Sequence, residues 1–232
     1  MNKAKKLGQN FLKSKTIAKF IVDNAEISKD DLVLEIGTGR GILIPYLVET
    51  GASVISVEKD KKLFSIIEKK FSDFDNLSLK CIDGFKIKQD FSILVSNLPY
   101  SQSKIAIEWL LQKKFSNAIV MLQKDFVQKL GETSKNRKAI SVLADYGFNI
   151  EILKHVKKYN FSPEPKVDSV IIQIRQKKVL EKELILNVNK LFSYRRKTVH
   201  NILKKFGKNN KSKKRLEELT TNEIIKLAKD IT

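Results

Sequence analysis

Residues 32–41 read Leu-Val-Leu-Glu-Ile-Gly-Thr-Gly-Arg-Gly, an apolar run that leads directly into three glycines at every second position. Glycine lets the backbone turn sharply and approach a ligand closely, and such a turn after a strand is typical of ligand-binding α/β sheets. Residue 42 is isoleucine, so the spacing is G-x-G-x-G and differs from the dinucleotide pattern G-x-G-x-x-G. We therefore predict a strand–turn–helix unit in which Gly37 and Gly39 contact a cofactor other than a dinucleotide.

Strands and helices are predicted to alternate through the body of the chain. The apolar, β-branched runs are Leu32–Ile36, Ser53–Glu58, Leu77–Ile82, Phe91–Ser96 and Ala118–Leu122. The helix-length segments between them are Gly41–Glu49, Lys61–Phe71 and Ser103–Lys113. This spacing indicates βαβ units. The predicted fold class is therefore α/β, a Rossmann-like parallel sheet with helices on both faces.

The chain changes character near residue 177. Before this point we expect the helix Lys124–Leu130, a loop at Gly131–Asn136, a helix ending at Tyr146, and the strands Asn149–Val156 and Ser169–Arg175 as an antiparallel hairpin at the sheet edge. After it the predicted short helices are Glu181–Tyr194, Thr198–Phe206, Lys213–Leu219 and Asn222–Lys229. The sequence therefore predicts two domains, a Rossmann-like domain over 1–176 and a small basic helical domain over 177–232.

Two acidic residues end the next two predicted strands. Glu58 follows Gly41 by 17 residues, where a carboxylate can accept hydrogen bonds from a ribose diol. Asp83 closes the third strand, where its side chain can reach an adenine amine. A glycine-rich turn alone is common. The three features together indicate a ligand that contains a nucleoside but no pyrophosphate. They favour S-adenosylmethionine over NAD as the cofactor.

The fourth strand leads into Asn97-Leu98-Pro99-Tyr100. Proline donates no hydrogen bond to a sheet and restricts the residue before it, so carbonyl groups here face a pocket. An exocyclic amine is a poor nucleophile, because its lone pair is delocalised into the ring. Acceptors on its N–H bonds, from the Asn97 side chain and the Leu98 carbonyl, would favour methylation without a strong base, and Tyr100 would stack on the base. The alternative is an ordinary Asn–Pro turn.

The charge of the chain is concentrated at its ends. The 232 residues carry a formal net charge of +19. Residues 1–19 contain six lysines and no acid, residues 177–232 contain 16 basic and 6 acidic residues, and the body between them carries only +3. Clustered cations gain from releasing the counterions of a polyanion, so a nucleic-acid partner is expected. No apolar run is long enough to span a membrane, and a membrane partner is not expected.

Cys81 is the one cysteine of the chain. A single cysteine excludes a disulfide framework and a metal site built from cysteines, and no metal is expected. We expect Cys81 to be a small buried residue in a strand. The first residues contain lysines but no apolar signal segment, so the predicted location is the cytoplasm.

Taken in order, these motifs resemble the small-subunit ribosomal RNA adenine N6,N6-dimethyltransferase family (KsgA-type), from Leu7 to about Lys204. The segments that carry the resemblance are Gly8–Leu12, Glu35–Gly41, Val57–Glu58, Asp83, Asn97–Tyr100, Phe161–Ser169 and Phe192–Thr198. Resistance methyltransferases of large-subunit rRNA share the first six in similar form. The Arg-Arg-Lys-Thr segment at residues 195–198 favours the small-subunit group.

The resemblance implies a role for each matched residue at the cofactor. Asn10 and Leu12 would line S-adenosylmethionine, and Gly37 would lie at its methionine end. Glu58 would hold the ribose and Asp83 the adenine.

The resemblance also implies how the target is held. Asn97 would bind the target amine, and Tyr100 and Phe161 would stack on the two faces of a flipped adenine, as their aromatic rings also permit. The family places two methyl groups on each of two adjacent adenosines near the 3′ end of small-subunit rRNA. The implied partners are this rRNA and a precursor of the small ribosomal subunit.

Basic residues of the last segment are candidates for phosphate contacts. The candidates are Arg195, Arg196, Lys197, Lys204 and Lys205. The alternative is that these side chains only cap and solvate helices. The charge asymmetry favours phosphate contact.

Several positions depart from the commoner family pattern. Gly84 replaces a frequent alanine, Ser96 precedes Asn97 where glycine or alanine is usual, and residues 101–103 read Ser-Gln-Ser. None of these changes removes a reacting group. Two other functions stay open: a non-catalytic ribosome-assembly or nucleic-acid-binding factor, against which the intact Asn97–Tyr100 and Glu58 argue, and a resistance-type methyltransferase of the large subunit. We expect a monomer.

Overall fold

The computed structural model describes residues 10–131 and 137–231, which divide into two compact units. The sheet unit consists of the described residues of Met1–Ala106, Lys113–Lys124 and Ile150–Gln176. The helical unit consists of the described residues of Ile107–Gln112, Asp125–Asn149 and Lys177–Thr232. A division after residue 176 is present, but the helical unit also includes two earlier segments that the sequence assigns to the first domain.

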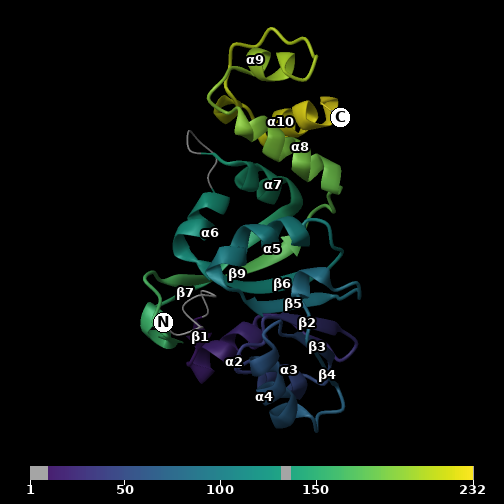
Figure 1. Cartoon of the computed structure of the whole chain (residues 1–232), viewed down its shortest axis with the longest axis vertical. Helices are drawn as coiled ribbons and strands as arrows, with labels where there is room; N and C mark the ends of the chain where they lie inside the picture. Colours follow the sequence, from purple (N-terminus) through teal and green to yellow (C-terminus); the bar gives the residue numbers. More distant parts are fainter. Residues whose placement is uncertain (1–9, 132–136, 232) are drawn as a thin grey trace. The chain divides into compact units, whose positions relative to one another are not determined.

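A seven-stranded sheet is the framework of the sheet unit (Figure 1). Its order is β4 (Leu77–Lys80), β3 (Ser53–Val57), β2 (Leu32–Ile36), β5 (Ile93–Asn97), β6 (Asn117–Gln123), β9 (Ser169–Gln176), β7 (Phe148–Val156). The pairs from β4 to β6 are parallel, and β9 is antiparallel to β6. The parallel sheet and the two neighbouring strands at its edge are therefore confirmed, with β9 as the inner strand of the two.

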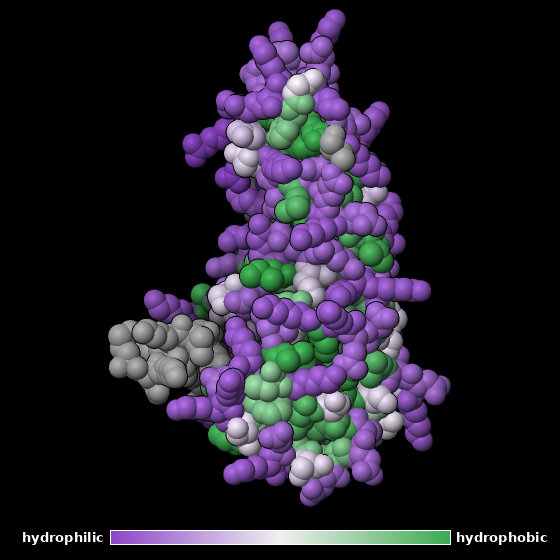
Figure 2. Space-filling model, turned by 45° about the vertical axis from the view of Figure 1, so that its right-hand side comes forward, coloured by the Kyte–Doolittle hydropathy of each residue, from purple (hydrophilic) through white to green (hydrophobic). Residues whose placement is uncertain are grey.

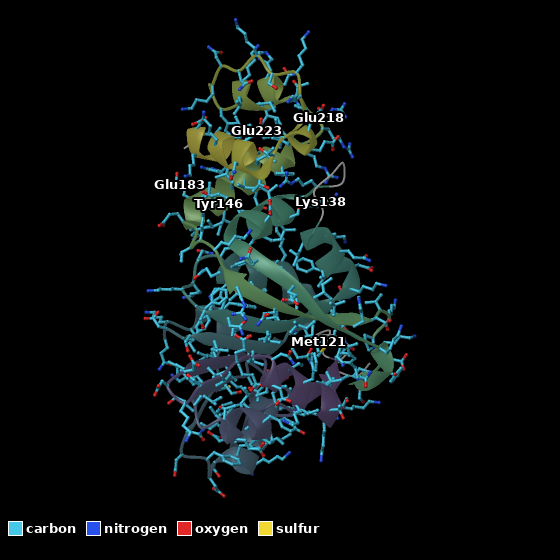
Figure 3. The ribbon with its side chains drawn as sticks, turned by 180° about the vertical axis from the view of Figure 1, so that it is seen from behind. Met121, Lys138, Tyr146, Glu183, Glu218 and Glu223 are labelled. Atoms are coloured by element: carbon cyan, nitrogen blue, oxygen red, sulfur yellow. The ribbon has the colours of Figure 1, made fainter. Side chains whose placement is uncertain are left out.

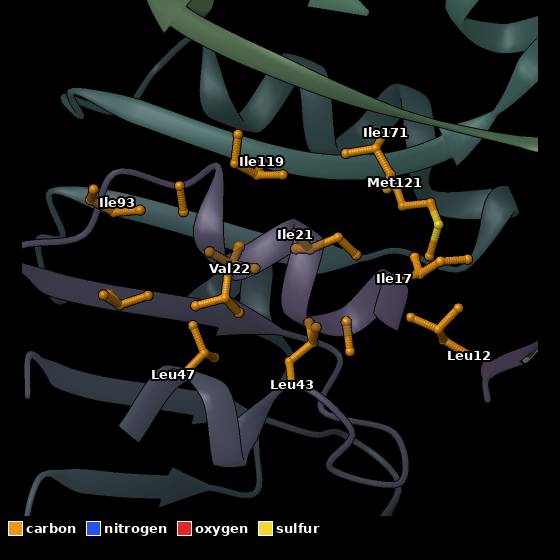
Figure 4. Packing of buried hydrophobic residues seen from close by; sticks show 14 of the residues in the cluster. Leu12, Ile17, Ile21, Val22, Leu43, Leu47, Ile93, Ile119, Met121 and Ile171 are labelled. Carbon is orange, nitrogen blue, oxygen red and sulfur yellow. The ribbon is translucent and has the colours of Figure 1, made fainter. Parts of the chain in front are cut away.

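Helices α2 (Lys15–Asp23) and α3 (Ile44–Glu49) pack on one face of this sheet. Ile17, Ile21 and Val22 of α2 meet Leu47 of α3 and buried residues of several strands (Figure 4). Helix α4 (Lys61–Phe71) begins at Asp60, whose side chain accepts the backbone N–H of Lys62 and Leu63, and packs against α3. The core thus fixes the carboxyl ends of the parallel strands β2, β3 and β5.

A second, very short sheet joins two distant parts of the sheet unit. Strand β1 (Phe11–Leu12) pairs antiparallel with β8 (Phe161–Ser162), with Leu12 opposite Phe161. Neither this pairing nor α2 follows from the sequence analysis. A two-residue strand is too short to show a period in its apolar residues.

Cys81 lies beyond the end of β4 and is exposed, which corrects the expectation of a buried thiol. The strand is shorter than the expected Leu77–Ile82. The predicted loop at Gly131–Asn136 lies, apart from Gly131, outside the described residues.

The helical unit is built from short helices with capped ends. Its helices are α6 (Lys124–Leu130), α7 (Ala139–Gly147), α8 (Lys182–Ser193), α9 (Val199–Lys204) and α10 (Thr221–Asp230), and α5 (Ser103–Leu110) contributes its last residues. Glu223, labelled in Figure 3, accepts the backbone N–H of Thr220 at 2.7 Å and closes the first turn of α10. Arg137 is buried and donates to the Leu219 carbonyl at 2.9 Å, which ties the chain before α10 to the start of α7.

The helix expected at Lys213–Leu219 is absent, and only the single turn η4 (Leu216–Glu218) forms there. The preceding residues run alongside the start of α9 instead, with the backbone N–H of Val199 bonded to the Lys214 carbonyl. Thr198 also forms an isolated antiparallel bridge with Arg215. Extended pairing therefore replaces the first turn of the expected helix. In the part of the chain that the structure describes, no helix is both long and apolar enough to cross a membrane.

Candidate active site

The glycine turn after β2 is fixed by backbone hydrogen bonds to β3. The N–H groups of Gly37 and Thr38 both donate to the Val57 carbonyl, at 2.9 and 3.2 Å. Gly37 and Gly39 have φ angles of 82° and 59°, a region that other residues rarely adopt. A Cβ atom on Gly39 would also lie 3.2 Å from the Phe11 ring. The turn therefore requires glycine at these positions, and its backbone faces the space beyond the strand ends.

Glu58 lies directly after β3 and is 5% exposed. Its Oε2 accepts the N–H of Gly39 at 2.9 Å, and its Oε1 accepts the N–H of Asp60 at 2.9 Å. Two backbone donors thus hold the carboxylate in one orientation. Each oxygen keeps a further lone pair for a ligand hydroxyl.

Asp83 caps the short turn η1 (Gly84–Lys86) by accepting the N–H of Phe85 at 3.1 Å. Gly84 follows it at a crowded position. A Cβ atom there would lie 2.6 Å from Cγ2 of Ile36 and 2.9 Å from Cγ2 of Val57. The glycine that departs from the family pattern therefore lets this turn pack directly on β2 and β3.

The Asn97 segment begins at the last residue of β5. Ser96, just before it, is fully buried, and its hydroxyl donates to the Ile36 carbonyl at 2.5 Å, so this serine ties β5 to the end of β2. Leu98 is buried, and Pro99 has φ and ψ angles of −56° and 132°. Tyr100 opens the turn η2 (Tyr100–Gln102), and its Oη lies 2.8 Å from Oγ of Ser169. Burial raises the pKa of the Tyr100 hydroxyl above its usual value, so the phenol stays protonated at neutral pH.

One cavity collects these segments, with a volume of about 950 Å³ including its open mouth. Its lining includes every residue predicted for the cofactor and the Asn97 segment: Asn10, Leu12, Gly37, Gly39, Glu58, Asp83, Asn97, Leu98, Pro99 and Tyr100. These residues come from β1 and from the ends of β2, β3, β4 and β5. The sheet unit therefore brings the glycine turn, both acids and the Asn97 segment together in one space.

Phe161 does not line this cavity, which corrects its expected place opposite Tyr100. It is 1% exposed and belongs to the core cluster that contains Leu12 and Ile171. The pairing of β8 with β1 turns its side chain into that core. In this structure, stacking on a base is therefore available from Tyr100 and not from Phe161.

Phe11 and Arg40 also line the cavity, and the sequence analysis assigns neither to the site. The guanidinium carbon of Arg40 lies 4.7 Å from the centre of the Phe11 ring, within the range of a cation–π contact. The only sequence signal was that Phe11 lies between Asn10 and Leu12 and Arg40 between two glycines of the turn.

A buried carboxyl group lies behind the glycine turn. Glu35 is 1% exposed and lines the cavity. It accepts a hydrogen bond from the Ser56 hydroxyl, which in turn lies 2.5 Å from Oγ1 of Thr38 in the turn. Burial raises the pKa of Glu35 to about 7, with the nearby Glu58 acting in the same direction. The turn is thus supported by a carboxyl group that is half protonated near neutral pH.

The five cations predicted to contact RNA all lie in the helical unit and are exposed. Within the described residues none of them forms an ion pair with an acid. Nζ of Lys205 lies 5.1 Å from the centre of the Tyr194 ring, which contacts the Phe206 ring edge-on. Figure 2 shows strongly hydrophilic residues over the part of this unit that contains α9.

The strand order, the cavity at the strand ends and the similar solved structure define the class of protein, a methyltransferase built on a Rossmann-like sheet. The family described as "Ribosomal RNA adenine dimethylase" matches residues 1–230. The chain belongs to this family, and the resemblance stated from its motifs is confirmed.

Named relatives and solved structures agree with this membership. The chain is 35% identical to "Ribosomal RNA small subunit methyltransferase A" of Thermotoga maritima, over 96% of this chain and 83% of the relative. The protein of the same name from Clostridium acetobutylicum is 33% identical, over 98% and 93% of the two chains.

A dimethyladenosine transferase from Plasmodium falciparum has a similar structure, with a TM-score of 0.80 and 26% identity over 94% of this chain and 95% of that one. The 23S rRNA methyltransferase ErmE shares the fold, with a TM-score of 0.71 and 22% identity over 96% and 99% of the two chains.

Proposed function

We propose that this protein transfers methyl groups from S-adenosylmethionine to the N6 amine of adenosines in small-subunit rRNA. In full, the proposal is two methyl groups on each of two adjacent adenosines near the 3′ end, made by a cytoplasmic monomer on the small ribosomal subunit or its precursor. The observation that carries it is that the Asn97–Tyr100 segment opens into the same cavity as the glycine turn and Glu58. Direct transfer requires donor and acceptor to meet in one space.

The cofactor end of the cavity fits S-adenosylmethionine. The glycine turn presents backbone without side chains, and Glu58 offers lone pairs to a ribose diol from a carboxylate that two backbone N–H groups already orient. Asp83 lies at the end of the next strand along, where it can accept from an adenine amine. When bound, the cofactor supplies an electrophilic methyl group on a sulfonium.

The target end fits an exocyclic amine. Asn97 Oδ1 and the Leu98 carbonyl are acceptors for its two N–H bonds in the first transfer and for the one that remains in the second, which localises the nitrogen lone pair toward the methyl group. The Tyr100 ring provides a stacking surface for the base. No strong base is needed: as the N–C bond forms, the C–S bond breaks to leave a neutral thioether, and the nitrogen, now positively charged, loses its proton to water.

The five exposed cations of the helical unit are proposed to bind RNA phosphates. Their exposure and their lack of acidic partners within the described chain support this role. So does the net charge of +10 carried by residues 177–232.

The test is incubation with labelled S-adenosylmethionine and unmethylated small or large ribosomal subunits, followed by mapping of dimethyladenosine. We expect label on two adjacent adenosines of the small-subunit RNA. Label on the large subunit alone would instead select a resistance-type methyltransferase. If neither particle is labelled and binding to the small subunit is retained, the protein is instead a non-catalytic assembly factor.

A further inference from the structure

Within the described residues, the side chain of Tyr100 has one hydrogen-bond partner, and it comes from a distant strand. Its hydroxyl lies 2.8 Å from the hydroxyl of Ser169, the first residue of β9. Ser169 is fully buried and pairs with Gln123 of β6, so its position is set by the sheet. Tyr100 itself lies in a short turn and is only partly buried. A strand of the sheet thus holds the far end of the ring and limits the swing of this side chain about its Cα–Cβ bond.

The residue before Ser169 is also fixed. The Asp168 carbonyl accepts the N–H of Lys124 at 3.1 Å. Its carboxylate accepts the N–H of Lys158 at 3.0 Å and pairs with Nζ of Lys157 at 3.0 Å. The start of β9 is therefore anchored to two other segments, and it gives Ser169 little freedom to follow a moving ring.

We propose that Ser169 is a positioning residue for the methyl acceptor: it fixes the place of the Tyr100 ring in the cavity before the target base enters. The inference rests on the proposed function, because Tyr100 is the stacking surface beside Asn97. With Phe161 buried in the core, Tyr100 alone of the two expected rings faces the cavity. A side chain that is already held in place loses less conformational freedom when the base stacks on it, so the bond favours the productive pose of the target.

The test is a double-mutant cycle in the full chain with Ser169→Ala, Tyr100→Phe and the double variant. Each removes the same hydroxyl–hydroxyl bond while keeping the ring. We expect each single variant to lower kcat/KM for small subunits by about fivefold to tenfold, the effect of one hydrogen bond. The double variant should lose no more than a single one. The dissociation constant of S-adenosylmethionine should stay within about twofold, since neither group lies at the cofactor end.

The cycle separates this inference from the function on which it rests. An inactive wild-type protein contradicts the proposed function, whereas an active one in which the two losses multiply contradicts the role of Ser169. If Ser169→Ala does not fold, Tyr100→Phe decides alone, and an unchanged kcat/KM overturns the proposal. Ser92→Ala is a matched control, because this serine bonds the Leu32 N–H at 3.0 Å and the Asp31 carboxylate at 2.7 Å, at the other end of the strands. It should change stability but not kcat/KM.

Discussion

In the cavity of the sheet unit two buried carboxyl groups are bonded to the chain itself, whereas around α9 in the helical unit the charged side chains face solvent. Both oxygens of Glu58 accept backbone N–H groups, and Glu35 accepts the Ser56 hydroxyl. Arg196 and Lys204, by contrast, are exposed and have no acidic partner within the described residues. The first region relies on geometry that is fixed before a ligand arrives, and the second on charge.

The two designs respond differently to change. A fixed site loses much when one partner is removed, because the remaining partner stays buried and unsatisfied. On a cationic surface each phosphate contact adds a small amount of binding free energy, and salt reduces each of these contributions. Substitutions in the cavity should therefore have large, specific effects that do not depend on salt. Substitutions around α9 should have small, additive effects that do depend on salt.

The largest effect is expected from Asn97→Ala. It removes a proposed acceptor for the target amine, so we expect kcat to fall by about a thousandfold or more, which corresponds to about 4 kcal/mol. The dissociation constant of S-adenosylmethionine, measured by calorimetry, should change by less than about threefold. Equal losses in cofactor binding and kcat would mean that Asn97 acts on the cofactor and not on the acceptor.

The next effect is on stability and comes from Glu35→Gln. The pKa of Glu35 is about 7 in the folded chain and has a reference value of 4.5, so the folded state binds the proton more tightly. Stability from this group is complete below about pH 4.5 and is lost as pH rises through 7. Glutamine stays neutral and can still accept from Ser56. The variant should therefore be more stable than wild type by about 3 kcal/mol at pH 8 and by less than about 1 kcal/mol at pH 5.

Urea unfolding of both proteins at the two pH values measures this difference. Glu68→Gln is the control, because Glu68 lies on the exposed side of α4 and should show no such growth with pH. A constant difference between Glu35→Gln and wild type at both pH values would mean that Glu35 is not the proton-binding group.

A smaller effect is expected from Glu58→Gln. Both carboxylate oxygens accept backbone N–H groups, so the amide of glutamine would place a donor against a donor. We expect the dissociation constant of S-adenosylmethionine to rise by about thirtyfold, or about 2 kcal/mol. Affinity for RNA should not change. A matching loss of RNA affinity would show that the substitution disturbs more than the cofactor end of the cavity.

The two regions also differ in how much of their structure could be predicted from the sequence. Gly37, Glu58, Asp83 and Asn97 could be placed together, because each follows a predictable apolar strand and parallel strands end at the same edge of a sheet. The orientation of Phe161 could not be predicted. It depends on β1–β8, a pairing of two residues across about 150 positions, and local patterns carry no information about such a contact.

In the helical unit the sequence predicted the positions of the cations but not all of their surroundings. Lys213, Lys214 and Arg215 have the composition of a helix surface, yet this stretch is extended, and the Val199 N–H donates to the Lys214 carbonyl. The competition between a helical turn and a strand-like pairing is decided by α9, which lies beyond the window of any local propensity. The exposure of Arg195–Lys197, in contrast, follows from charge alone.

The smallest effects are expected from single substitutions of the five cations around α9. Each of Arg195→Gln, Arg196→Gln, Lys197→Gln, Lys204→Gln and Lys205→Gln should weaken small-subunit binding by about threefold to tenfold. Each should also reduce the slope of log affinity against log salt concentration by about 0.7 to 0.9, because one phosphate contact fewer releases fewer counterions. Cofactor affinity should stay constant at every salt concentration.

Filter binding over a series of salt concentrations measures both quantities. The matched controls are Lys62→Gln, Lys69→Gln and Lys114→Gln, which remove the same charge from exposed positions of the sheet unit. If net charge alone mattered, these controls would weaken binding as much as the α9 variants do. A loss of affinity confined to the α9 variants would show that RNA is bound at a defined surface. Long-range attraction is screened within about 8 Å at physiological salt and does not distinguish one exposed lysine from another.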